Sequence, residues 1–215
     1  MGSDVVVYTA VFGGRDTFRP PQNLPYDFRI FTDSPEIADK DDRAIYVPLL
    51  VPRDHIRSAR LVKVMSHVFL PGYKTWIWQD SSFDIKPEAD LAELIFRAGE
   101  LGVWKHTQRS CIYEEARACI DLGKDNEDVI KAQMQKYMSY YQHPPGAGLG
   151  ETGLLVRQNT PRIRRFNAEW WKEIALHSCR DQLSFNVIAR RFNLEVNYLG
   201  NLRENPWLVY VGHRR

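Results

Sequence analysis

The sequence predicts an α/β domain built on a mostly parallel sheet with helices on both faces. Its 215 residues fit one domain, and a hydrophobic fraction of 44% is enough to bury a core. Residues 4–12 (DVVVYTAVF) are apolar almost throughout, which is typical of a strand buried on both faces in a parallel sheet. Predicted strands then alternate with helices over the first half of the chain, an order that indicates an α/β sheet.

The other strands are predicted where β-branched and aromatic residues gather between turn signals. Gly13-Gly14 ends the first strand, and Asp33-Ser34-Pro35 closes the second, at 27–32 (DFRIFT). The remaining strands are expected at 43–47, 75–78 (TWIW), 102–105, 152–157 and 195–198.

Helices are predicted where apolar residues recur every three to four positions. In 57–69 the apolar face consists of Leu61, Val64, Met65 and Val68. Further helices are expected at 89–98, 112–122, 126–141, 168–176 and 181–191. Residues 143–150 (HPPGAGLG) are too rich in proline and glycine for anything but a loop, and 205–215 is expected to be a tail.

Composition disfavours several classes of protein. A net charge of +2 is too weak for a dedicated nucleic-acid binder. Three cysteines without a CxxC pair, no apolar run of about 20 residues and no signal-peptide pattern predict a cytoplasmic protein with reduced thiols. The chain has no GxSxG elbow, no HExxH motif and no zinc-like Cys/His spacing, which disfavours serine hydrolases and zincins.

Asp80 is the first candidate for chemistry, because it follows the predicted strand 75–78 almost directly. In α/β sheets ligands bind beyond the carboxyl ends of the strands, where residues 9–14, 33–34 and 79–82 should meet. A carboxylate there can bind a divalent cation, or it can be a turn residue that caps the backbone after it. Both interpretations fit Asp80 taken alone.

Basic residues on the predicted helix 57–69 are a second candidate. Arg57, Arg60, Lys63 and His67 lie along one flank, where they could neutralise a diphosphate. The same spacing describes an ordinary solvated helix face.

Three further polar residues are candidates for chemistry, and two of them, His106 and Asp181, also have a structural interpretation. His106 with its nearby carboxylates could be a metal ligand or an acid–base group, or it could precede a helix that Ser110 caps. Glu151 follows a glycine-rich loop, where a general base or a sugar-hydroxyl acceptor could lie. Asp181 opens a predicted helix and could simply be its N-cap.

Seven blocks of the chain, taken together, resemble a known family. They are VVYTAVFGG (6–14), FRIFTDS (28–34), RSARLVK (57–63), FLPGYKTWIWQDSS (69–82), HTQRSCIYEEA (106–116), GLGETGLLVRQN (148–159), and WWKEI with RDQLSF (170–185). Their order and spacing resemble the glycosyltransferase-like domain family first catalogued as a domain of unknown function, which has plant Golgi and bacterial members. The resemblance covers residues 5–200, nearly the whole chain.

That family is similar to GT-A glycosyltransferases, so the resemblance implies a GT-A Rossmann-like three-layer sandwich. It implies a nucleotide-binding half at 4–82, an acceptor-binding half at 102–200 and a C-terminal tail at 201–215. The implied activity is transfer of a sugar from a nucleoside diphosphate sugar to a saccharide or other hydroxyl acceptor, in polysaccharide or glycoconjugate synthesis. Neither nucleic acid nor an integral membrane segment is expected.

The expected site residues fall into three groups. The resemblance implies donor contacts from Thr9, Ala10, Val11, Phe12, Asp33, Arg57, Arg60, Lys63, Asp80 and Ser82. Acceptor contacts are expected from His106, Arg109, Gln182 and Trp170. Asp181 and Glu151 are the expected catalytic residues, since Asp181-Gln182 resembles the Asp-Gln pair that opens a late helix in several GT-A families.

Metal binding is the least regular feature of the resemblance. The DxD motif of GT-A enzymes would begin at Asp80, but Ser82 stands where its second carboxylate is expected. Mn²⁺ or Mg²⁺ would then need another ligand beside Asp80, such as His106 or His213, or basic residues would replace the metal.

Two alternatives stay open at this point. A nucleotidyltransferase on a similar sheet would have a glycine-rich basic loop after the first strand, which Gly13-Gly14-Arg15-Asp16 matches only in part. A nucleotide-sugar-binding module without catalysis would explain the absent second carboxylate of the DxD motif.

Overall fold

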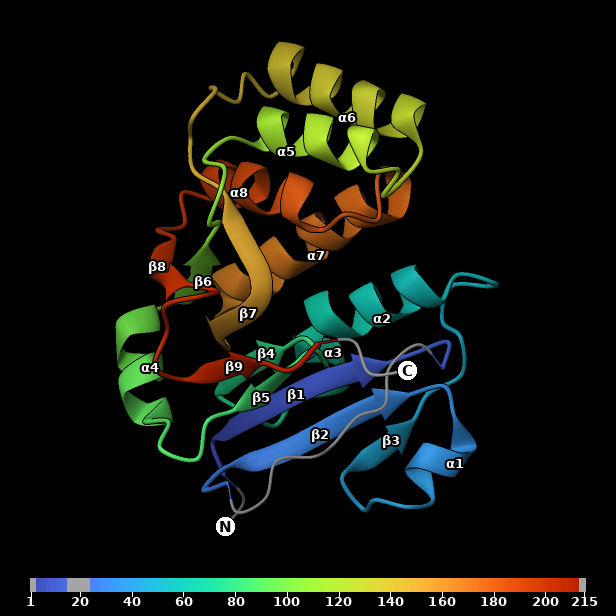
Figure 1. The fold of residues 1–215 in the computed structure, drawn as a ribbon, viewed down its shortest axis with the longest axis vertical. Helices are drawn as coiled ribbons and strands as arrows, with labels where there is room; N and C mark the ends of the chain where they lie inside the picture. The colour runs from blue at the N-terminus through green and yellow to red at the C-terminus, as the bar shows by residue number, and fades with distance from the viewer. Residues whose placement is uncertain (1–2, 15–23, 213–215) are drawn as a thin grey trace.

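The computed structural model describes residues 3–14 and 24–212, which form a three-layer α/β sandwich (Figure 1). Its central sheet has seven strands in the order β3-β2-β1-β4-β7-β6-β8. The strands are β1 (Val5–Val11), β2 (Asp27–Thr32), β3 (Ala44–Tyr46), β4 (Thr75–Gln79), β6 (Leu101–Lys105), β7 (Gly150–Gln158) and β8 (Asn197–Asn201). The α/β class with a mostly parallel sheet is therefore confirmed.

One strand runs against the others, and it matters for the site. β7 is antiparallel to both of its neighbours, β4 and β6, whereas every other pair in the sheet is parallel. The start of β7 consequently lies at the edge where the parallel strands end. The first residues of β7 can thus meet the last residues of its neighbours β4 and β6 at one edge of the sheet.

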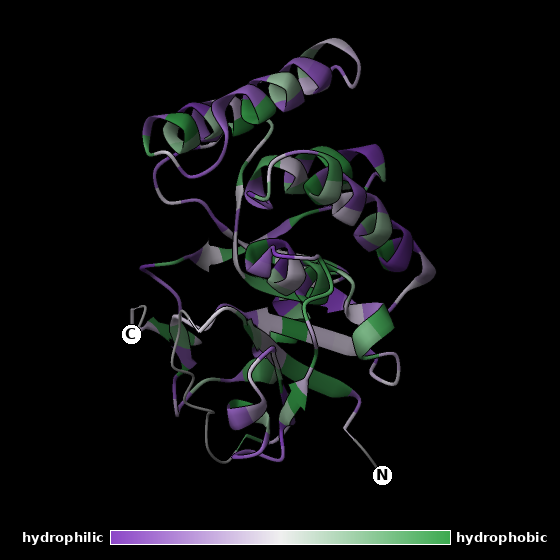
Figure 2. Ribbon diagram, turned by 90° about the vertical axis from the view of Figure 1, so that its right-hand side faces the viewer, coloured by the Kyte–Doolittle hydropathy of each residue, from purple (hydrophilic) through white to green (hydrophobic). Residues whose placement is uncertain are grey.

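Alternation along the strands builds a core on each face of the sheet. Val6 and Tyr8 face one core together with α2 (His55–Val64), α7 (Pro161–Leu176) and α8 (Gln182–Arg191). Val7 and Val11 face the other core, which α4 (Leu91–Ala98) and the small sheet of β5 (Phe83–Ile85) and β9 (Leu208–Tyr210) cover. Figure 2 shows hydrophobic residues concentrated on the central strands and hydrophilic ones on the outer faces of the helices.

A further helical layer packs on α8. Helices α5 (Ile112–Asp121) and α6 (Glu127–Ser139) share a third apolar cluster with α8, and they lie above it in Figure 1. The short helices α1 (Pro35–Ala38) and α3 (Ser66–Phe69) complete the fold. No helix within the described residues has the length and apolar character needed to cross a membrane.

Several boundaries differ from the sequence prediction. The helix expected at 57–69 breaks at Met65 (φ −88°, ψ 40°) into α2 and α3. The break has a cause in the core: the guanidinium of Arg157 donates hydrogen bonds to the carbonyl oxygens of Lys63 (2.6 Å) and Val64 (2.9 Å). The last carbonyl oxygens of α2 therefore accept hydrogen bonds from a buried guanidinium, and the helix ends there.

Two other elements differ from the sequence prediction: one helix begins earlier than expected, and one strand lies in the expected tail. α7 begins at Pro161 rather than at 168, because Thr160 caps it by accepting from the Ile163 amide, with proline in the first turn. The expected tail contains β9, which pairs with β5 across a long separation in sequence.

Candidate active site

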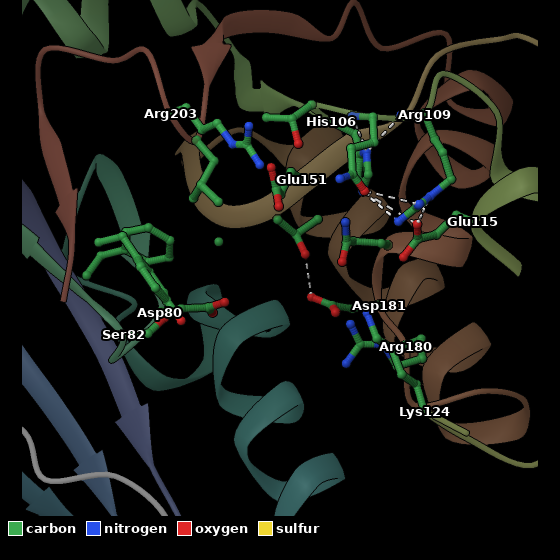
Figure 3. A pocket seen from close by; sticks show the side chains of 18 of the residues that line it. Asp80, Ser82, His106, Arg109, Glu115, Lys124, Glu151, Arg180, Asp181 and Arg203 are labelled. Carbon is green, nitrogen blue, oxygen red and sulfur yellow. Dashed lines mark hydrogen bonds and ion pairs between the residues drawn. The ribbon is translucent and has the colours of Figure 1, made fainter. Parts of the chain in front are cut away.

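A pocket of about 440 Å³ opens at the edge where the parallel strands end (Figure 3). Asp80 and Ser82 reach it from the end of β4, and His106 from the end of β6. Glu151 enters from the start of β7, and Asp181 from the start of α8. The pocket thus brings together some of the expected donor, catalytic and acceptor residues from four different elements.

Asp181 is a buried carboxylate held by cations and does not cap its helix. It occupies the N-cap position of α8, but its side chain makes no capping hydrogen bond. Its Oδ2 lies 2.6 Å from the ammonium of Lys63 and accepts from the Thr152 hydroxyl (2.8 Å), whereas Oδ1 lies 3.3 Å from Arg60 Nε. Burial works to raise the pKa of Asp181, but Arg60 and Lys63 outweigh it and hold that pKa far below its usual range. Asp181 is therefore a fixed anion.

Lys63 stabilises the Asp181 carboxylate from a buried position behind the residues that line the pocket. Its side chain is 0% exposed, and its ammonium lies 3.5 Å from Asp80 and donates to the Thr152 hydroxyl (3.2 Å). Burial lowers the pKa of Lys63, opposed by Asp181 and Asp80. Lys63 does not line the pocket, so the expectation that it faces the diphosphate is not met in this structure.

Of the other two basic residues predicted for the donor, only Arg60 reaches the pocket. Arg57 points elsewhere: it pairs with Asp54 and donates to the carbonyl oxygens of Ile174 (3.1 Å) and His177 (2.6 Å). Arg57 therefore ties α2 to the end of α7 and does not contact this pocket.

Asp80 keeps a partly exposed carboxylate, with 32% of its side chain accessible. One oxygen accepts from the Trp78 indole (2.8 Å) and lies 4.0 Å from Arg60, in addition to the contact with Lys63. Within residues 3–14 and 24–212, no three His, Cys, Asp or Glu side chains are grouped to hold a metal ion. His213 lies outside the described residues. The described donors, a single carboxylate countered by two cations, do not by themselves fit a divalent ion.

Glu151 has the opposite electrostatic setting from Asp181. Its Oε2 is buried without a hydrogen-bond partner, and burial raises the pKa of its carboxyl group, with Glu115 and Asp80 adding to the rise. A break in register between β6 and β7 places it: Val103 pairs with Leu155, and the next residue, Trp104, pairs with Glu151. Such bulges commonly aim side chains at active sites.

A network on the β6–α5 connection forms another wall of the pocket. His106 Nδ1 accepts from the backbone amides of Gln108 (3.2 Å) and Arg109 (3.1 Å), and burial lowers the pKa of its imidazole against the opposing effect of Glu115. Glu115, almost completely buried, accepts from Arg109 Nε (2.6 Å). The two amides thus fix the orientation of the His106 ring and of the loop, and Arg109 presents a fixed guanidinium.

The nucleotide-side residues are at the same sheet edge but do not line this pocket. Thr9 and Phe12 are buried, Ala10 is half-buried, and Thr9 Oγ1 has no hydrogen-bond partner. Asp33 accepts from the Gly13 amide (3.0 Å) and lies 2.8 Å from His55 Nδ1. Asp33 therefore joins the ends of β1 and β2 to the start of α2.

One predicted acceptor residue is placed elsewhere by the structure. Trp170 is 0% exposed and donates its indole N–H to the carbonyl oxygen of Asp181 (3.1 Å), so it supports the site from the core and does not reach an acceptor. Gln182 does line the pocket. Sequence reasoning missed Thr152, Lys124, Arg180 and Arg203, which also line it.

The fold and site define an α/β domain that gathers charged groups at the carboxyl edge of its sheet, and comparison with known proteins identifies its family. The model of the TOD1/MUCI70 glycosyltransferase-like domain family matches residues 43–205. The chain belongs to this family, which confirms the resemblance seen in the sequence.

The chain is also similar to one curated protein and to one solved structure. The "Probable hexosyltransferase MUCI70" of Arabidopsis thaliana is 22% identical over 223 aligned residues, which include 90% of this chain. The chain spans only 38% of that protein's length. The apo structure of mouse xyloside xylosyltransferase 1 is 11% identical, with a TM-score of 0.49 over 93% of this chain and 85% of the mouse chain.

Proposed function

We propose that this domain transfers a glycosyl group from a nucleoside diphosphate sugar to a hydroxyl acceptor. Membership of a glycosyltransferase-like family supports the reaction class. The name of the plant relative supports a hexose as the transferred sugar. The pocket supports the location, because α/β sheets bind ligands beyond the carboxyl ends of their strands.

The observation that carries the proposal is the contrast between two carboxyl groups in one pocket. Asp181 is paired with Arg60 and Lys63, and its pKa is lowered. Glu151 is unpartnered at Oε2, and its pKa is raised. Two carboxyl groups whose environments move their pKa values apart are suited to different tasks, one as a fixed charge and one as a proton carrier.

The reaction assigns a task to each group. As the bond between the anomeric carbon and the diphosphate oxygen breaks, its electron pair goes to the diphosphate, and positive charge develops on the sugar ring. The fixed anion Asp181 stabilises that positive charge, and the pocket-lining guanidinium of Arg60 stabilises the leaving diphosphate. The acceptor oxygen forms the new bond to the anomeric carbon, and Glu151, when ionised, accepts the proton that this hydroxyl loses.

The metal requirement stays a prediction. Mn²⁺ or Mg²⁺ at Asp80 depends on a further ligand such as His213, because the described donors do not suffice alone. We likewise retain a cytoplasmic location and a role in polysaccharide or glycoconjugate synthesis as proposals, which the sequence pattern supports.

Titration calorimetry with UDP, GDP, ADP and CDP, with EDTA or with MnCl₂, tests the donor site. We expect one nucleoside diphosphate to bind in preference to the others, and the difference between EDTA and Mn²⁺ measures the metal requirement. Absence of binding by all four would overturn the proposal.

Turnover assays separate the alternatives. Release of a nucleoside diphosphate from its sugar supports a glycosyltransferase. Formation of pyrophosphate from a nucleoside triphosphate and a sugar 1-phosphate would identify a nucleotidyltransferase. Binding without any turnover would identify a nucleotide-sugar-binding module.

A further inference from the structure

The charged groups of the pocket divide into paired and unpaired ones. Arg109 is paired with Glu115, and Arg60 with Asp181. Lys124 and Arg180 also line the pocket, and for neither side chain does the described part of the chain provide an ion-pair partner. We call Lys124 and Arg180 the cation pair.

Arg180 has an unmet hydrogen-bonding requirement within this pair. Its Nε–H is buried and has no acceptor among the described residues. A buried donor without a partner costs free energy that a ligand oxygen recovers on binding, and the bond is stronger when that oxygen is charged.

The two cations lie close to each other. Both are near enough to the thiol of Cys119 to oppose the rise that burial causes in its pKa, and Figure 3 shows their side chains next to each other. Neighbouring like charges repel each other unless an anion lies between them. The arrangement is that of an anion-binding site, completed by a bidentate guanidinium and a flexible ammonium.

The position of the cation pair separates it from the proposed diphosphate site. Asp80 and Ser82, at the end of β4, lie on one side of the pocket in Figure 3, and the cation pair lies on the other, with Asp181 between them. If the diphosphate leaves beside Arg60 and Asp80, the cation pair faces the saccharide part of the substrates.

We propose that Lys124 and Arg180 bind an acidic group, a carboxylate or a phosphate, on a saccharide that this domain uses as donor sugar or acceptor. The role of this saccharide as donor or acceptor rests on the proposed glycosyl transfer, whereas the binding of an acidic group by the cation pair does not. An acidic saccharide bonds to Arg180 through its charged oxygens, while a neutral sugar brings no charged oxygen to the buried Nε–H of Arg180.

Proton–nitrogen NMR of arginine Nε–H groups tests the site directly. The probes are glucuronate and glucose 6-phosphate, with neutral glucose as their matched control and UDP as the control for the diphosphate. We expect both acidic sugars to shift the Arg180 Nε–H signal and to bind about tenfold or more tightly than glucose. A response to only one of them shows whether the site takes the carboxylate or the phosphate.

Variants make the assignment specific. We expect Arg180→Gln and Lys124→Gln each to reduce the affinity for the acidic sugar to nearly that for glucose. Arg117→Gln, on the exposed side of α5 and outside the pocket, should leave it unchanged.

Two results overturn the proposal. The first is equal affinity for acidic and neutral sugars. The second is a loss of UDP affinity in Arg180→Gln as large as the loss for the acidic sugar, because the cation pair would then bind the diphosphate. Failure of the proposed function looks different: acidic sugars would still bind, but no nucleotide sugar would be turned over.

Discussion

Asp181 stands directly before a helix, where a carboxylate is usually an exposed N-cap, but in the structure it is buried. A carboxylate that opens a helix usually accepts from the first-turn amides, yet Asp181 instead contacts Lys63, Arg60 and Thr152. The lowered pKa of Asp181 stabilises the fold at neutral pH, and that stability is lost as pH falls through its folded-state pKa.

Replacing Lys63 by Met tests how strongly this pair holds the fold. The change leaves a buried carboxylate with Arg60 as its nearest cation, so we expect a loss of about 3–5 kcal/mol in the free energy of unfolding. Urea denaturation measures it. The double variant Lys63→Met/Asp181→Asn should recover much of the loss, and exposed Lys40→Met should change stability by less than about 0.5 kcal/mol. A loss in Lys63→Met that the double variant fails to recover would show that the charge pair is not its cause.

Glu151 determines the expected pH dependence of turnover. As the proton acceptor it must be ionised, so activity should fall as pH decreases through its pKa, at a pH above the ordinary value for glutamate. Glu151→Gln should lower kcat about 100-fold or more and abolish this acidic limb. Its folding should be at least as stable at neutral pH, because burying the ionised group carries a cost that Gln avoids. An unchanged pH profile in Glu151→Gln would exclude the assignment.

The sequence predicted which acidic residues gather at the site, but not how the basic ones are divided. Asp80 and Glu151 could be placed because a strand end and a glycine-rich loop mark the sheet edge, whereas Asp181 was placed only through the family resemblance. Lys63 and Arg60 are three positions apart on one helical flank, and periodicity alone does not show that only Arg60 reaches the pocket. Trp170 was misplaced for the same reason, since its burial depends on packing between α7 and α8.

Among the elements, β7 decides the geometry of the site. Because it runs antiparallel to its neighbours, its first residues lie among the ends of the other strands. The register break opposite Val103 and Trp104 then leaves Thr152 and Gly153 free of β6, and Thr152 uses its hydroxyl to bind Asp181. Neither the direction nor the register of β7 could be derived from its own residues, because both depend on distant partners.

The contact between β6 and α4 depends on a glycine and provides a test at this scale. A Cβ on Gly102 would lie 2.5 Å from Ala98 Cβ and 2.8 Å from its Cα, so Gly102→Ala must push α4 away from the sheet. We expect a loss of about 1–3 kcal/mol in the free energy of unfolding, measured by thermal or urea denaturation. Gly72→Ala, where a Cβ would meet no atom within 4 Å, is the matched control and should change little. Equal stability of the two variants would contradict this packing.

At the scale of the whole molecule, one sheet joins the two predicted halves. β1 to β4 carry the predicted donor side, β6 to β8 carry the predicted acceptor side, and the pair β4–β7 connects them. The pocket opens where these groups of strands meet. The division at 4–82 and 102–200 therefore stays a prediction about which ligand each half binds.

We propose that this pocket transfers a sugar from a nucleotide with Asp181 as its fixed anion. The most direct test incubates the domain with UDP- and GDP-sugars and measures nucleoside diphosphate release in the wild type, in Asp181→Asn and in the exposed control Asp121→Asn. We predict release by the wild type and by Asp121→Asn, with a loss of about 100-fold or more in Asp181→Asn although that variant stays folded. Full activity of a folded Asp181→Asn variant would contradict the account.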